Sequence, residues 1–335
     1  MRTRRLFLAF RRSLLRPQVL DNAEFKRATN PRFVPTFERE KRLSQATLTV
    51  KKDETMKTTI VIPARFGSKR FPGKPLAKLE GKAILQRVWE IAAEVCSQVP
   101  DCDAVVATET PDLENRSERI VEFCESRRIP VVVTSSSCRS GSDRAWAAVS
   151  FREETPDVVV NLQGDNPICP PRFVVDLIEA LRDNINADVA TIYTRLNWEA
   201  LDALRAAKKT SPFSGTTVAV AKTGDALWFS KNIIPAIRGE EALRAESSTS
   251  PILRHVGLYA YRFDALRFFA NSKKGEYEKL EQLEQLRFIE NGYKIQMIEG
   301  AYPPGFEEVT SGVDTPEDLE RVAAVIRRRG EILGR

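Results

Sequence analysis

Four cationic side chains lie within fourteen residues of a stretch that is rich in glycine and proline. The stretch reads PARFGSKRFPGKPL, residues 63–76, and directly follows the apolar run TTIVI. Its cations, Arg65, Lys69, Arg70 and Lys74, can offset several phosphate charges, and arginine can hold oxygens with two parallel hydrogen bonds. Its glycines let backbone N–H groups approach an anion, and its prolines fix the shape of the loop. The stretch therefore predicts a phosphate-binding loop after a first strand, in preference to a solvated basic loop.

This loop does not have the spacing of a Walker P-loop, which reads G-x-x-x-x-G-K-[ST]. Gly67 and Gly73 are one residue too far apart, and Pro75 stands where the metal-binding hydroxyl belongs. The dinucleotide pattern G-x-G-x-x-G is not present in the loop either. The loop thus predicts a phosphate ligand and gives no support to a dinucleotide site.

Two aspartates stand where an α/β protein can hold a cation. Asp165 ends the predicted strand VVVNLQGD, and Asp314 lies in GVDTPEDLE before the last predicted helix. Acids at the carboxyl ends of parallel strands commonly hold metals. Each also has a structural alternative, because Asp165 can cap a helix before Pro167, and D-T-P-E-D is ordinary chemistry for a helix start. The spacing alone does not show that the two carboxylates meet.

Several other polar residues have both a functional and a structural interpretation. Gln163 precedes Gly164, which lets a ligand approach the backbone, but Gln163 can also be a satisfied polar group at a strand end. Ser140 and Gly141 follow the third predicted strand and can equally form a turn and a helix cap. The chain has one histidine, His255, which excludes a multi-histidine metal site. A lone histidine is more often structural than catalytic.

Two acids near the C-terminus are predicted to share one helix face. Glu281 and Glu284 lie three residues apart in EYEKLEQLEQLRFIENG, residues 276–292, which we predict as one charged helix. Residues at that spacing are neighbours on a helix surface. A solvated charged face is the ordinary interpretation of such a pair.

Strands and helices alternate after Met56 and must position these residues. The predicted strands of the first part are TTIVIP, DAVVAT, IPVVVT and DVVVNLQGD, with helical periodicity between them. Short apolar strands that alternate with helices of ~10–15 residues indicate β-α-β units. We predict an α/β fold, a three-layer α/β/α domain with a mostly parallel sheet. The strands DVATIYTR, TTVAVA and HVGLYAYRF predict a smaller β-rich region at 187–262, and EEALRAESSTSP has the composition of a mobile loop.

The charge of the chain is concentrated in its first 55 residues. The 335 residues carry a net charge of +6, and residues 1–55 carry 14 Lys and Arg against 6 acids, so the remainder carries −2. Since that remainder has no basic stripe with interleaved aromatics, we expect no nucleic-acid partner. No apolar run approaches the ~18 residues of a membrane span. The five cysteines form no C-x-x-C pair, which predicts free thiols.

Residues 1–55 have two interpretations, and both separate them from the predicted domain at 56–335. The first twenty residues hold six arginines and no acid, and Leu6, Phe7, Phe10 and Leu14 fall on one side of a helical wheel. This composition is typical of an organellar transit peptide. The alternative is that translation starts at Met56 and that the segment is a leader without a fold. The second interpretation predicts a cytoplasmic protein, and the first an organellar one.

The ordered motifs of the chain resemble one family of enzymes. IPARFGSKRFPGKPL is similar to the signature P-A-R-x-x-S-x-R-[LF]-P-G-K-P-L of the 3-deoxy-manno-octulosonate (Kdo) cytidylyltransferases, the CMP-Kdo synthetases. SGSDR at 140–144, NLQGDNP at 161–167, RHVGLYAYR at 254–262, LEQLR at 283–287 and GVDTPEDLE at 312–320 follow in the family's order. The match spans about residues 57–325. Such an ordered set is far more specific than any one of its parts.

The resemblance implies a reaction and a set of site residues. CTP and an eight-carbon acid sugar, Kdo, would give CMP-Kdo and pyrophosphate for glycans of the lipopolysaccharide type. The implied fold is that of the nucleotide-diphospho-sugar transferases, and the β-rich region would cover the sugar and form a homodimer. Four residues would act in catalysis: Arg65, Lys74, Asp165 and Asp314. The residues implied to bind the nucleotide are Ala64, Arg65, Ser68, Arg70, Lys74, Ser140, Gly141 and Gln163.

The resemblance also implies how the metal and the sugar are held. Asp165 and Asp314 would hold Mg²⁺ against the nucleotide phosphates, which suits a hard cation with oxygen ligands. The residues implied to contact the sugar are Gln163, His255, Tyr259, Glu281 and Glu284.

Two departures from the family pattern concern the identity of the sugar. Asn166 stands where the family often has glutamate, and Thr217 aligns with a lysine that many members carry. A sister activity on a sialic-type sugar or an 8-amino variant of Kdo is therefore an alternative. A non-catalytic nucleotide-sugar sensor is another, although both aspartates and Lys74 argue against it. A metal-dependent glycosyltransferase would need a D-x-D motif, and QGDNP has one aspartate.

Overall fold

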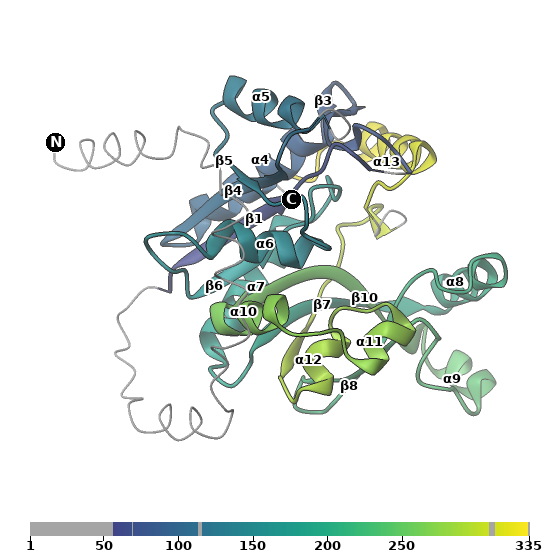
Figure 1. The fold of residues 1–335 in the computed structure, drawn as a ribbon. Coiled ribbons are helices and arrows are strands. Elements are labelled where there is room, and N and C mark those ends of the chain that lie inside the picture. Colours follow the sequence, from purple (N-terminus) through teal and green to yellow (C-terminus); the bar gives the residue numbers. More distant parts are fainter. Residues whose placement is uncertain (1–55, 69, 113–115, 308–311, 334–335) are drawn as a thin grey trace, which may run out of the picture.

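The parallel strands of the predicted domain form one continuous sheet. This computed structural model describes residues 56–68, 70–112, 116–307 and 312–333, so the predicted leader at 1–55 lies outside the described residues. The strands follow the order β11-β7-β10-β6-β1-β4-β5. Figure 1 labels each of these strands except β11. Their bounds are β1 Thr58–Pro63, β4 Cys102–Glu109, β5 Val131–Thr134, β6 Val158–Asn161, β7 Val189–Asn197, β10 Thr249–Arg262 and β11 Ile295–Glu299. Along this path β10 pairs antiparallel with both of its neighbours, and the other pairings are parallel.

Helices cover both faces of this sheet, as the alternation of strands and helices predicts. On β1, Ile60 and Ile62 pack on one face of the sheet, and Val61 packs on the other. The first face is covered by α4 Ile84–Gln98, α5 Glu118–Ser126, α7 Pro171–Asp183 and α13 Pro316–Arg329, and the second by α6 Gly141–Val149 and α10 Phe263–Asn271. Because β1 is buried on both sides, its sequence is a continuous apolar run without alternation. The three-layer α/β/α prediction is confirmed.

The region after β7 contains elements that the sequence analysis did not predict. Strands β8 Thr217–Val220 and β9 Ala226–Ser230 extend the sheet beside β10, and β9 was not predicted. A helix, α8 Trp198–Thr210, also lies in this region. The predicted mobile loop EEALRAESSTSP instead contains a helix, α9 Glu240–Glu246, and the start of β10. The loop prediction was wrong because Arg244 and Arg205 both bond the Glu240 carboxylate, which anchors α9 to α8.

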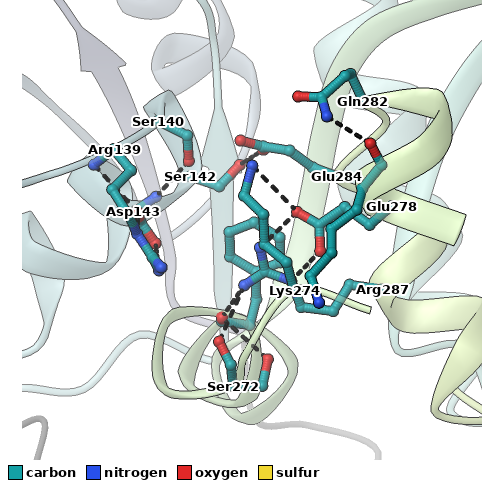
Figure 2. Close-up of polar contacts among 12 residues, drawn as sticks. Arg139, Ser140, Ser142, Asp143, Ser272, Lys274, Glu278, Gln282, Glu284 and Arg287 are labelled. Atoms are coloured by element: carbon teal, nitrogen blue, oxygen red, sulfur yellow. Dashed lines mark hydrogen bonds and ion pairs between the residues drawn. The ribbon is translucent and has the colours of Figure 1, made fainter. Parts of the chain in front are cut away.

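The predicted charged helix at 276–292 is broken into two. Helix α11 Glu276–Glu281 ends where Gln282 adopts a left-handed backbone with φ of 54°, and α12 Leu286–Glu290 follows. A buried ion pair joins the two pieces: Arg287 donates to both carboxylate oxygens of Glu278 at 2.6 Å (Figure 2). Helical periodicity depends on local spacing and cannot predict this tertiary contact. The prediction of a single helix was therefore wrong.

Within the described residues, no helix is long and apolar enough to cross a membrane. All five cysteines are free thiols.

Candidate active site

Three segments that are far apart in the sequence meet past the carboxyl end of β1. The first is the start of the basic loop, where the Ala64 amide donates to a backbone carbonyl of β4 at 2.8 Å. The second follows β6, and a Cβ atom on Gly164 there would lie 2.5 Å from the Pro63 carbonyl oxygen. The third precedes α13, where the Val313 amide donates to the Asp165 carbonyl at 2.8 Å. Glycine at position 164 thus lets the strand end approach the basic loop closely.

Lys74 lies at the centre of this junction. Its ammonium donates to Asp165 Oδ2 at 2.8 Å and to Asp314 Oδ1 at 3.1 Å. Arg70 forms a further ion pair with Asp314 Oδ2 at 3.0 Å. The Lys74 side chain is 10% exposed, whereas the Asp165 and Asp314 side chains are 33% and 42% exposed. The structure therefore brings together two carboxylates whose meeting the sequence spacing did not show.

Neither aspartate serves as a helix cap. Thr315 caps α13: its hydroxyl accepts from the Asp318 amide, and the Asp318 carboxylate accepts from the Thr315 amide. This capping box satisfies the first amides of the helix and leaves the Asp314 carboxylate to face Lys74. Helix α7 begins at Pro171, six residues after Asp165. The helix-start interpretation of D-T-P-E-D is therefore confirmed for the motif, although Asp314 itself is not the cap. The cap interpretation of Asp165 was wrong.

The chemistry of these donors fits a magnesium ion that is bound together with phosphate. Two carboxylates already converge on one cationic nitrogen, so the junction attracts positive charge. Within the described residues, no group of three or more His, Cys, Asp or Glu side chains could form a complete metal cage. Mg²⁺ commonly takes one or two protein carboxylates and completes its shell with substrate phosphates and water.

The basic loop is closed on itself by its own backbone. The amides of Ser68 and Gly73 both donate to the Phe66 carbonyl, at 2.9 Å and 2.8 Å. Gly73 has a φ of 74°, a conformation that residues with a side chain rarely adopt. Arg65 is exposed at the start of the loop, and Lys69 lies outside the described residues. This backbone structure favours the prediction of a phosphate-binding loop with a fixed shape over that of a solvated basic loop.

Gln163 and the Ser140–Gly141 segment lie against each other. Ser140 caps α6, with its hydroxyl accepting from the Asp143 amide at 3.2 Å, so its structural interpretation applies. A Cβ on Gly141 would lie 2.9 Å from Gln163 Nε2, which means that glycine gives the amide room. Gln163 Nε2 donates to Asn161 Oδ1 at 3.1 Å. The two segments that the resemblance assigns to the nucleotide are therefore adjacent.

His255 and Tyr259 lie next to this group on β10. Tyr259 pairs in register with Asn161, and the His255 ring lies 5.4 Å from the Tyr259 ring. Desolvation, with a smaller contribution from the Lys231 charge, lowers the pKa of His255 to about 3. Its Nε2 is 2.9 Å from the Thr191 hydroxyl. His255 is therefore a neutral hydrogen-bonding group at neutral pH, and the geometry does not favour a role as a proton carrier there.

Glu281 and Glu284 do not share a face, in contrast to the prediction. Glu281 Oε1 accepts from the Ser230 hydroxyl at 2.8 Å, and Glu281 Oε2 accepts from the Lys231 amide at 2.7 Å. Glu284 Oε2 instead accepts from the Ser142 hydroxyl at 2.7 Å, at the start of α6 (Figure 2). The turn at 282 points the two carboxylates toward different elements. Shared helical spacing was the wrong basis for grouping them.

Comparison with known proteins gives one consistent family. The cytidylyltransferase family profile matches residues 59–295. The "3-deoxy-manno-octulosonate cytidylyltransferase" of Maricaulis maris is 38% identical over 83% of this chain and 100% of its own. The chain belongs to this family. The Arabidopsis thaliana "3-deoxy-manno-octulosonate cytidylyltransferase, mitochondrial" is 32% identical, over 80% of this chain and 83% of its own.

A solved structure of this family agrees with the fold. It is described as CMP:2-keto-3-deoxy-manno-octonic acid synthetase complexed with CTP, and it is 35% identical with a TM-score of 0.66. The alignment covers 81% of this chain and 99% of that one. The family membership and fold class that the ordered motifs indicated are therefore confirmed.

The two departures from the family pattern have clear surroundings in this chain. The backbone N–H of Asn166 donates to the backbone carbonyl of Gln163 at 3.1 Å and helps form the turn after β6. The Thr217 hydroxyl donates to the Asn232 carbonyl at 2.7 Å and accepts from the Ile234 amide at 3.0 Å. Thr217 therefore holds the segment that follows β9.

Several residues near the site were not singled out from the sequence. Lys231 lies near His255, and its ammonium donates to the Thr216 hydroxyl at 3.1 Å. Ser142, Asn161 and Tyr261 form a buried polar group beside Gln163. Ser142, Asn161 and Tyr261 lie inside the motifs SGSDR, NLQGDNP and RHVGLYAYR. Their membership in these motifs could have identified them from the sequence. Nothing in the sequence distinguished Lys231 from other strand-end lysines.

The depressed pKa of His255 predicts an acid-sensitive contribution to stability. The folded-state pKa of about 3 lies below the ordinary value of 6.5. The unfolded chain therefore binds a proton below about pH 6.5 that the folded chain does not, and stability falls as the pH drops toward 3. Between pH 7 and pH 5, we expect this residue to cost about 2 kcal/mol. Urea unfolding at both pH values should show a smaller loss for His255→Gln than for the parent protein. Equal losses would contradict a histidine that stays neutral in the folded protein.

Proposed function

We propose that this protein transfers CMP from CTP to the anomeric hydroxyl of Kdo and releases pyrophosphate. One observation carries the proposal: Lys74, near the end of the closed basic loop, contacts both Asp165 and Asp314. Family membership supports the substrates, because the relatives are named for Kdo and the solved relative contains CTP. The proposed reaction is a direct displacement, in which the anomeric oxygen attacks the α-phosphorus and the bond to the β-phosphate oxygen breaks.

The chain's own residues can supply binding and alignment for this displacement. Arg65, Arg70 and Lys74 would offset the charge of the triphosphate, and Gln163 would orient the groups where nucleotide and sugar meet. Positioning and charge stabilisation are the main contributions that proteins make to phosphoryl transfer. Asp165 and Asp314 would hold Mg²⁺, which when bound supplies charge neutralisation to the phosphates.

The sugar would be recognised on β10 and the segments packed against it. His255, Tyr259 and Glu281 would face the acid sugar, and the Lys231 ammonium adds positive charge beside His255. A carboxylate on the substrate suits such a site, because a half-buried lysine lacks the full hydration of a surface one. Desolvation lowers the pKa of Lys231.

The deciding experiment measures pyrophosphate release from CTP across a panel of acid sugars. We expect release with Kdo, little with 8-amino-Kdo or a sialic-type sugar, and none without sugar. Release without any sugar would contradict a sugar cytidylyltransferase. Preference for another acid sugar would assign the same chemistry to a different substrate, and CTP binding without release would indicate a sensor.

We also propose a homodimer, located in the cytoplasm unless residues 1–55 direct it to an organelle. Leu227 on β9 and Tyr277 and Leu280 on α11 are large apolar side chains that remain exposed, and Trp228 and Tyr277 pack edge to face. Exposed apolar groups of this kind can be covered by a second copy of the chain. Sedimentation equilibrium would test the mass, and a monomer at micromolar concentration would contradict the dimer. A reporter fused to residues 1–55 would test the location.

A further inference from the structure

Four side chains form a continuous chain of hydrogen bonds from Glu284 to Gln163. Gln163 Nε2 donates to Asn161 Oδ1 at 3.1 Å, and Asn161 Nδ2 donates to Ser142 Oγ at 3.3 Å. The Ser142 hydroxyl donates to Glu284 Oε2 at 2.7 Å. The Tyr261 hydroxyl lies 3.1 Å from the same Ser142 oxygen. These hydrogen bonds thus connect the segment between α11 and α12, the start of α6 and the end of β6. Figure 2 shows the Ser142–Glu284 bond at one end of this series.

The direction of every bond in this chain follows from the carboxylate at its end. Burial raises the pKa of Glu284, and hydrogen bonds from the Ser140 and Ser142 hydroxyls oppose that shift by stabilising the ionised form. In that ionised form the carboxylate only accepts, so the single hydroxyl proton of Ser142, 2.7 Å away, points to Glu284. The Ser142 oxygen then accepts from both Asn161 Nδ2 and the Tyr261 hydroxyl. Burial raises the pKa of Tyr261, which keeps its phenol protonated and able to donate. Asn161 is left to offer its carbonyl oxygen, and Gln163 must therefore meet it with its NH₂ group.

We propose that Glu284 is a positioning residue that fixes the orientation of the Gln163 amide. With its NH₂ group committed to Asn161, Gln163 offers Oε1 as an acceptor to a donor group of the ligand, such as a hydroxyl or an amino group. The inference rests on the proposed function, in which Gln163 lies where nucleotide and sugar meet. It assigns Glu284 an indirect role through Ser142 and Asn161 instead of direct contact with the sugar.

Burial makes this control effective. Asn161 is 0% exposed and Ser142 is 1% exposed, so water cannot readily replace a reversed bond. An unsatisfied buried donor or acceptor is costly, so all the hydrogen bonds from Glu284 to Gln163 must keep the same donor-to-acceptor direction. A glutamine at position 284 would remove this restriction. Its NH₂ could donate to Ser142, whose proton could then turn to a flipped Asn161, and Gln163 would have to reverse.

A double-mutant cycle separates this role from a general structural one. Glu284→Gln alone should lower kcat/KM for the sugar by roughly 10–100-fold, the size of loss that a misplaced substrate contact produces. In a Gln163→Ala background the same change should cost no more than about 2-fold, because the group that it orients is gone. Glu281→Gln, a matched change outside the hydrogen-bond chain, should cost the same in both backgrounds. A Glu284→Gln loss that is equally large in both backgrounds would overturn the proposal.

A second measurement reads the orientation without turnover. In ligand-free protein labelled with ¹⁵N on Asn and Gln side chains, the Asn161 and Gln163 amide protons should exchange slowly with solvent. Glu284→Gln, or Ser142→Ala where the first variant does not fold, should speed that exchange at least 10-fold, since the chain loses its fixed direction. Unchanged exchange would overturn the inference. Failure of the proposed function would instead appear as a parent protein that releases no pyrophosphate from CTP and Kdo.

Discussion

Asp165→Asn and Asp314→Asn are each expected to lower kcat by roughly 10² or more, while the protein still folds. Asparagine keeps the shape of the side chain and removes the negative charge, so the change acts on the cation-binding junction. A loss of this size is typical when charge that develops in the transition state loses its partner. Folding should survive because both carboxylates are about a third or more exposed. Steady-state pyrophosphate release at saturating CTP and Kdo measures the effect.

A matched surface change provides the control for this prediction. Asp264→Asn removes one carboxylate that is 77% exposed and pairs with Arg267 on the same helix, so its turnover should equal that of the parent protein. Melting temperatures of all three variants should agree within a few degrees. Turnover near the parent value in Asp165→Asn or Asp314→Asn would remove the basis for the metal assignment.

The central sheet could be predicted because its strands carry their own local signal. β1 matches the predicted TTIVIP run at both ends, and its β-branched residues are buried on both faces. The basic loop could be placed at the carboxyl end of that strand for the same reason. Strand order and the antiparallel β10 could not be derived, since pairing across the sheet joins residues far apart in the sequence.

The convergence of Asp165 and Asp314 also depends on tertiary structure. The two residues come from the end of β6 and the start of α13, and no local pattern relates them. Only the ordered motifs indicated that both belong to one site. The fold places both carboxylates in contact with one nitrogen, the Lys74 ammonium, and so assigns them to the same site.

The errors near the C-terminus have a common physical cause. The sequence EYEKLEQLEQLRFIENG is rich in the strong helix formers Glu, Leu, Gln and Lys, so local propensity favours one continuous helix. The buried pair of Glu278 and Arg287 and the left-handed Gln282 override that propensity. As a result Glu281 reaches β9, and Glu284 reaches α6. A one-residue change of backbone conformation thus separated two acids that the spacing had grouped.

Lys74→Met should lower kcat/KM for CTP by roughly 10³ and should also strengthen the binding of a divalent cation to the ligand-free protein. Methionine fills a similar volume, so the change removes the ammonium with little loss of packing. The first effect follows because a largely buried ammonium is lost from beside the proposed phosphate site, where it is screened little by water. The second follows because the ammonium and a cation compete for the same carboxylate oxygens of Asp165 and Asp314.

The two effects have opposite signs, which makes the Lys74 prediction specific. Asp165 Oδ2 and Asp314 Oδ1 lie no more than about 6 Å apart, because Lys74 Nζ is 2.8 Å from the first and 3.1 Å from the second. Removal of the ammonium removes a counter-charge between them, so each carboxylate favours a nearby cation more strongly. Calorimetric titration with Mn²⁺ in the absence of CTP should therefore show a Kd about 10-fold lower than that of the parent protein. Lys82→Met is the matched control: its ammonium pairs with Glu90 at 39% exposure, and its removal should change neither quantity. Cation binding that weakens together with CTP turnover would mean that Lys74 organises the two aspartates instead of competing for them.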